Sequence, residues 1–258
     1  MKIAVLVKRV PDTASVFIIA DSGRSVDLSG IKFVMSPYDE HAVEQAIRVK
    51  ENNQAEVIVV SAGPPEAKDV IRSGLAMGAD SGVLVTGEDL DELTPKNTAR
   101  VLAAAVKELE PDVVFAGKQA VDDDAAQVPE RVASLLDIPH VSVVTRFELQ
   151  GDFAAVDREI EGGHYTFDVK LPALFTVDKA LNTPRYPTLP NIMKAKRKPI
   201  EEKDLAALGL TPDSLSPGIE ITAMALPRQE RLGKILEGEI PEQVSELVRA
   251  LREDEKIF

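Results

Sequence analysis

Short apolar runs alternate with amphipathic helical patterns over the first 180 or so residues, and this alternation restricts the fold more than any other feature. The runs rich in β-branched residues, which we predict to be buried strands, are 3–7, 57–60, 82–85, 113–116 and 173–177. Strands that are separated by helices generally pair in parallel. We therefore predict an α/β fold with an open, mainly parallel sheet and helices on both faces.

Proline and its neighbours mark where helices begin and end between these runs. Ser36 followed by Pro37 is typical of a helix start, with an N-cap residue and a proline at the first helical position. Thr94 followed by Pro95 repeats this signal, and Pro111 halts the helix that it begins. The sequence therefore predicts strand–helix–strand units.

The pattern changes after residue 138. The runs 141–147, 153–158 and 165–169 are short and partly alternating, and glycine-containing turns join them. Such spacing is typical of antiparallel strands, which we expect to be added to the parallel sheet.

The last part of the chain has few core positions. From Asn182 the sequence becomes proline-rich and then basic, and only 241–252 has the pattern of an amphipathic helix. A segment of this kind buries too little apolar surface to offset its ordering entropy alone. We therefore predict a first domain at 1–182 and, at 183–258, an extended C-terminal arm that packs against something else.

Composition excludes several classes of function. The net charge of −13 argues against nucleic-acid binding, which needs an excess of Lys and Arg. Cysteine is absent, so thiolate nucleophiles and Cys-ligated metal sites are excluded. His41, His140 and His164 show no ligand spacing, and we predict no metal site and no catalytic group. The apolar run near the N-terminus is too short for a signal peptide or a membrane span, so we expect no membrane insertion and a cytoplasmic location.

Three loops follow predicted strands at the edge where ligands bind in parallel sheets: 8–12, 61–65 and 117–128. Two of them run into helix N-termini, whose free N–H groups suit a phosphate, and Asp122 to Asp124 could accept hydrogen bonds from a ribose or an adenine amine. The glycines of these loops could equally be ordinary turn residues, and the acids could cap a helix. Neither of the common dinucleotide and P-loop motifs is present.

Residues 117–128 resemble the adenosine-phosphate loop of electron-transfer flavoprotein beta subunits, whose pattern runs G-K-Q-A-I-D-D-D. Two further stretches resemble the same family: D-R-E-I-E-G-G at 157–163, and R-Y-P-T-L-P-N-I-M-K-A-K at 185–196. The last of these is the family's signature and is highly specific. The resemblance covers essentially the whole chain and weakens after about residue 200.

The resemblance implies a shallow cradle for the FAD domain of an alpha subunit, with a structural AMP in this chain. By this resemblance, residues 1–182 would form a nucleotide-binding domain. Residues 183–258 would form a recognition loop and a C-terminal arm that packs on the partner subunit. The implied nucleotide contacts are Leu6, Ser36, Pro37, Tyr38, Asp39, Ala62, Gly117, Lys118, Gln119, Ala120, Val121, Asp122, Asp123, Asp124, Ala125, Ala126, Gln127 and Val128.

The resemblance also implies a docking surface. Leu189 would insert into a hydrophobic pocket on acyl-CoA-type dehydrogenases, and electrons would pass through FAD on the alpha subunit to a quinone reductase. The implied partner-binding residues are Glu159, Tyr186, Thr188, Leu189, Pro190, Ile192, Met193 and Lys194. From the residues alone, a proline-rich linker with a buried leucine is an alternative interpretation.

Some residues depart from the AMP-binding pattern. Ala126 and Val128 stand where that form offers Asn and Thr, and Gln127 resembles a bifurcating group that carries a second FAD and uses NADH. Asp123 and Pro129, however, replace glycines of that group and should narrow the site, which favours AMP.

We therefore interpret the chain as a non-catalytic electron-carrier subunit. Two alternatives remain open at this stage. One is a bifurcating subunit that binds a second FAD and oxidises NADH, and the other is a stand-alone adenine-nucleotide-binding regulator.

Overall fold

The computed structural model describes residues 1–87, 90, 93–216, 218–227 and 233–257. The chain forms two compact units. The first comprises residues 1–17 and 28–221, and the second comprises residues 18–27 and 222–258.

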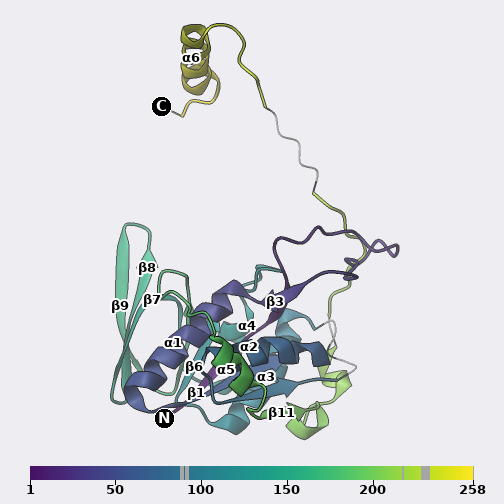
Figure 1. The fold of residues 1–258 in the computed structure, drawn as a ribbon, viewed down its shortest axis with the longest axis vertical. Helices are drawn as coiled ribbons and strands as arrows, with labels where there is room; N and C mark the ends of the chain where they lie inside the picture. The colour runs from purple at the N-terminus through teal and green to yellow at the C-terminus, as the bar shows by residue number, and fades with distance from the viewer. Residues whose placement is uncertain (88–89, 91–92, 217, 228–232, 258) are drawn as a thin grey trace. The chain divides into compact units, whose positions relative to one another are not determined.

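A nine-stranded sheet lies at the centre of the first unit, in the order β11-β5-β4-β1-β6-β10-β7-β8-β9 among the described residues (Figure 1). The strands are β1 Lys2–Leu6, β4 Glu56–Ala62, β5 Ser81–Val85, β6 Val113–Gly117, β7 His140–Gln150, β8 Phe153–Ile160, β9 Gly163–Lys170, β10 Ala173–Val177 and β11 Ile200–Lys203. Pairing is parallel from β11 to β7, and antiparallel between β7, β8 and β9. A separate antiparallel pair joins β2 Arg9–Pro11 to β3 Phe33–Met35. The predicted fold class is confirmed.

Helices cover both faces of the sheet. The helices of the first unit are α1 Pro37–Asn53, α2 Lys68–Met77, α3 Pro95–Leu109, α4 Val128–Leu136 and α5 Leu189–Ala195. Helix α6 Ile240–Arg249 belongs to the second unit. Both predicted proline-marked starts are confirmed, since α1 begins at Pro37 and α3 at Pro95. Among the described residues, none of these helices has the length and apolar character needed to cross a membrane.

Burial on both faces explains why the central strands read as continuous apolar runs. In β1, Ile3 and Val5 belong to a core shared with α1 and α2, whereas Ala4 and Leu6 belong to a second core shared with α3 and α4. Successive side chains of a strand point to opposite faces, so a strand that is covered on both sides needs apolar residues at every position.

The segment that was expected to be an arm is divided between the two units. Residues 183–221 lie in the first unit and contain α5 and β11, and residues 222–258 lie in the second. Strand β11 was not predicted because Glu201, Glu202 and Lys203 leave it no apolar run. Its backbone instead pairs with β5, so that β11 forms the edge of the sheet. Packing of this region on a partner subunit stays a prediction.

Asp39, in the first turn of α1, connects that helix to two central strands. One carboxylate oxygen accepts the backbone N–H of Lys8 at 2.7 Å, and the other accepts the N–H of Gly117 at 3.1 Å. A Cβ at Gly117 would lie 2.5 Å from Asp39 Oδ1, so glycine is what permits this close approach. Burial raises the pKa of Asp39 to about 7, although both N–H bonds favour the ionised form.

The raised pKa makes a testable prediction about stability. The pKa of Asp39 is about 7 in the folded chain and 3.8 in the unfolded chain. Between these pH values the folded state therefore holds a proton that the unfolded state has released. The contribution of this carboxyl to the free energy of unfolding is therefore complete below about pH 4 and is lost as the pH rises to about 7.

We expect the unfolding free energy of the wild type to fall relative to that of Asp39→Asn over this window, as measured by urea denaturation at a series of pH values. The amide that Asp39→Asn introduces does not titrate, so the variant reports the pH dependence that all other groups contribute. A difference between the two proteins that stays constant from pH 4 to 7 would contradict the assignment.

Candidate functional site

A cavity of about 100 Å³ opens where the carboxyl ends of β1, β4 and β6 meet the first turns of α3 and α4. Its lining residues are Leu6, Val7, Lys8, Asp39, Ala62, Leu93, Pro95, Thr98, Leu102, Ala116, Gly117, Gln119, Ala120, Asp123, Ala125, Ala126, Gln127, Val128 and Pro129. Most of these side chains are apolar. The cavity lies at the sheet edge where parallel α/β folds bind ligands.

The cavity brings together many of the residues predicted to hold a nucleotide, from four separate segments of the chain. Those that line it are Leu6, Asp39, Ala62, Gly117, Gln119, Ala120, Asp123, Ala125, Ala126, Gln127 and Val128. The predicted residues outside its lining are Ser36, Pro37, Tyr38, Lys118, Val121, Asp122 and Asp124. Lys118 instead forms an ion pair with Asp178 at 2.7 Å.

One wall of the cavity was not predicted as part of the site. Leu93, Pro95, Thr98 and Leu102 contribute this wall from the start of α3. The signal for it was present in the sequence. The Thr94-Pro95 helix start follows the predicted strand 82–85, so this helix had to begin at the same edge of the sheet.

The loop between β6 and α4 is held in shape by its own acidic residues. Lys8 Nζ lies 2.7 Å from a carboxylate oxygen of Asp122 and 3.3 Å from one of Asp123. Gln119 Nε2 donates to Asp124 Oδ1 at 2.7 Å. The backbone is left-handed at Asp124, with φ 48°, and at Ala126, with φ 47°, a conformation that costs energy in non-glycine residues. The aspartates therefore order the loop, and Lys8 offsets part of their charge.

The residues around the cavity fit an adenine nucleotide better than a metal ion. The N-cap residue of α4, Gln127, makes no side-chain cap hydrogen bond, and the start of this helix lines the cavity, so its first N–H groups suit a phosphate. Leu6, Leu93 and Leu102 offer an apolar wall for a base. Within the described part of the chain, no group of three His, Asp or Glu side chains could hold a metal.

A second, polar cleft lies along the antiparallel strands. It is lined by Thr145, Arg146, Asp157, Glu159, Ile160, Gly162, Gly163 and His164. Thr166 Oγ1 donates to Asp157 Oδ1 at 2.7 Å, and this bond, with Arg146 nearby, holds the pKa of Asp157 below its usual range. Glu159, one of the predicted partner-binding residues, is exposed at this cleft.

The other predicted partner-binding residues lie on and just before α5. Tyr186 is 95% exposed, Leu189 78% and Met193 62%. Thr188 caps the helix, because its Oγ1 accepts the N–H of Asn191 at 3.4 Å. The leucine is therefore not buried in a linker. It stands in solvent at the start of an ordered helix.

Comparison with known proteins gives a consistent family. A sequence model of the electron transfer flavoprotein domain matches residues 25–208. The electron transfer flavoprotein subunit beta of Bacillus subtilis is 40% identical over 259 residues, which cover 100% of both chains. The subunit beta of Bradyrhizobium diazoefficiens is 41% identical over 98% of both chains, and that of Homo sapiens is 42% identical over 90% of this chain and 91% of its own.

The family model matches most of the chain, and these relatives match nearly its full length. Together these matches establish the family. The chain belongs to the electron transfer flavoprotein beta-subunit family.

Proposed function

We propose that this chain is the non-catalytic beta subunit of an electron carrier that works in the cytoplasm. It binds a structural AMP, pairs with an alpha subunit that holds FAD, and docks acyl-CoA-type dehydrogenases through Tyr186, Leu189 and their neighbours. Electrons then leave to a quinone reductase. When FAD is bound by the alpha partner, it supplies the reversible redox chemistry, and this chain supplies the surface that brings partners together.

The observation that carries the docking role is the exposure of Leu189 at the start of α5. Leu189 is 78% exposed, and Tyr186 and Met193 extend the apolar surface on both sides of it. Apolar side chains gathered on an ordered surface mark interaction sites more often than single exposed leucines do. Lys194 and Lys196 adjoin this surface and would steer acidic partners toward it.

The cavity supports AMP as the bound nucleotide in preference to a second FAD. Asp123 and Pro129 both line it, at positions where glycine would leave more room. The N-terminus of α4 lines the cavity, so a phosphate can be held by its backbone N–H groups without an arginine or a metal. Asp39 and Gly117 fix the floor of the cavity through their hydrogen bond.

The docking role predicts a defined effect of Leu189→Ala. Burying a leucine contributes about 1.5–3 kcal/mol, so losing it should raise the KM of the dehydrogenase for the heterodimer roughly ten- to hundredfold. The measurement is FAD reduction by an acyl-CoA dehydrogenase at varied heterodimer concentration. FAD content should not change.

Leu135→Ala is the matched control, because Leu135 is 53% exposed on α4, outside the proposed docking surface. Equal KM values for wild type, Leu189→Ala and Leu135→Ala would refute the docking role.

The nucleotide role predicts that a larger side chain in the cavity displaces AMP. Ala125→Leu adds apolar volume to the lining, and overpacking of this kind costs about 1–3 kcal/mol. We expect AMP affinity to fall roughly five- to hundredfold, as measured by chromatography of nucleotides released from the purified heterodimer after graded dilution.

Ala207→Leu is the control for this change, since Ala207 is exposed in the short turn Ala206–Leu208. AMP retention that is the same in all three proteins would show that this cavity does not hold the nucleotide.

A further inference from the structure

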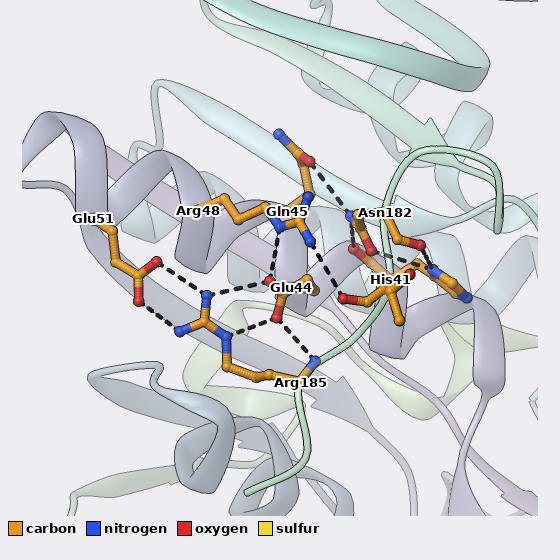
Figure 2. A network of polar contacts seen from close by, with 8 residues as sticks. His41, Glu44, Gln45, Arg48, Glu51, Asn182 and Arg185 are labelled. Atoms are coloured by element: carbon orange, nitrogen blue, oxygen red, sulfur yellow. Dashed lines mark hydrogen bonds and ion pairs between the residues drawn. The ribbon is translucent and has the colours of Figure 1, made fainter.

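The residues just before the exposed surface at 186–193 are tied to α1 by a continuous network of polar contacts (Figure 2). Asn182 begins it: its side-chain amide donates to the backbone carbonyl of His41 at 3.0 Å, and the His41 ring nitrogen Nδ1 lies 3.0 Å from the carbonyl oxygen of Asn182. Arg48 donates to the carbonyl oxygen of Thr183 at 3.3 Å. Residues 182 and 183, just before Arg185, are thus hydrogen-bonded to α1.

Arg185 carries the strongest of these contacts. Its Nε and its backbone N–H donate to one oxygen of Glu44, at 2.8 and 3.2 Å. Its two terminal nitrogens donate to the two oxygens of Glu51, at 2.5 and 3.0 Å. Glu44 and Glu51 are two helical turns apart on α1, so they lie on the same face. One guanidinium therefore spans both carboxylates, a geometry that the planar fork of arginine permits and that lysine cannot reproduce.

The two carboxylates are not equivalent. The Glu44 side chain is 3% exposed, whereas that of Glu51 is 55% exposed. Burial opposes ionisation of Glu44, but hydrogen bonds from Arg185 and Arg48 outweigh it and hold its pKa below the usual range. Arg48 also bonds Glu44 at 2.8 Å. Glu44 therefore keeps a cationic partner if Arg185 is replaced, and the variant is expected to fold.

A second set of contacts holds the chain just after the exposed surface. Arg72, on α2, donates to the carbonyl oxygens of Ala195 and Lys198 at 2.6 and 2.7 Å. Lys198 donates in turn to the carbonyl oxygens of Leu75, at 3.1 Å, and Ala79 near the end of α2. The exposed residues 186–193 therefore lie between an anchor on α1 and an anchor on α2.

We infer that Arg185 is a positioning residue, which holds the segment 186–193 in one conformation through Glu44 and Glu51. This inference deepens the proposed docking function and rests on it for its biological meaning. A surface that is already ordered loses less conformational entropy when a partner binds, so fixing the segment raises affinity without adding a contact. Arg185 does not need to touch the partner to do this.

The test uses the purified heterodimer and compares Arg185→Gln and Glu51→Gln with wild type. Backbone hydrogen exchange over 186–193 reports the conformation of the segment directly. We expect exchange there to be at least about tenfold faster in Arg185→Gln, and to rise by a smaller factor in Glu51→Gln, because Glu44 remains to hold the guanidinium. Glu51→Gln also serves if Arg185→Gln does not fold.

Lys203→Gln is the matched control. Lys203 also lies between two carboxylates, those of Glu108 and Glu201, but it joins β11 to α3 on another part of the sheet. Its replacement should leave exchange over 186–193 unchanged. If Lys203→Gln accelerated hydrogen exchange over 186–193 as much as Arg185→Gln does, the acceleration would reflect general destabilisation. That result would overturn the inference.

Kinetics with an acyl-CoA dehydrogenase then separate positioning from docking. Arg185→Gln should raise the KM for the heterodimer about fivefold with kcat unchanged. In a Leu189→Ala background it should cause no further rise in KM, because Arg185 acts through the segment to which Leu189 belongs. Unchanged exchange over 186–193 in both Arg185→Gln and Glu51→Gln would overturn the inference. If exchange accelerates but Leu189→Ala leaves KM unchanged, the positioning role stands and the docking function is refuted.

Discussion

The hydrogen bonds that the buried carboxylate of Asp39 accepts are the interaction on which the rest of the structure depends. They join the first turn of α1 to Lys8, which lies between β1 and β2, and to the last residue of β6. The cavity opens at this junction, and the glycine at 117 is what lets the carboxylate approach. A buried carboxylate with two backbone donors is costly to form but specific in geometry. It fixes the segment after β1, the end of β6 and the start of α1 relative to one another, and the starts of α3 and α4 complete the walls of the cavity.

The same helix also organises the surface proposed for docking. The first turn of α1 carries Asp39 toward the cavity, and later turns carry Glu44 and Glu51 toward Arg185. Both features that we connect with function are thus built on one 17-residue element whose inner face is buried in the core. Electron transfer between proteins requires a fixed geometry between the partners and needs no acid or base groups. A chain whose cavity and exposed surface are both connected to one helix by hydrogen bonds is suited to that task.

Much of the first unit could be predicted from the sequence because burial on both faces leaves a plain signal. Strands such as β1 and β6 read as unbroken apolar runs, and proline marks the start of α1 and α3. Strand β11 could not be predicted, since backbone pairing with β5 forms it and its side chains are mostly charged.

The contacts of Arg185 with α1 could not be predicted from the sequence either. Arg185 lies 134 and 141 residues from its carboxylate partners, and no local pattern links them. The loop 117–128 was singled out by its place after the predicted strand 113–116, and the family resemblance connected it with AMP. The wall from α3 was missed, although the helix start at Thr94-Pro95 was a signal for it.

The most direct test of the proposed function is the ratio of FAD to AMP released from the purified wild-type heterodimer. The account predicts one of each, whereas two FAD and no AMP, with reduction by NADH, would contradict it.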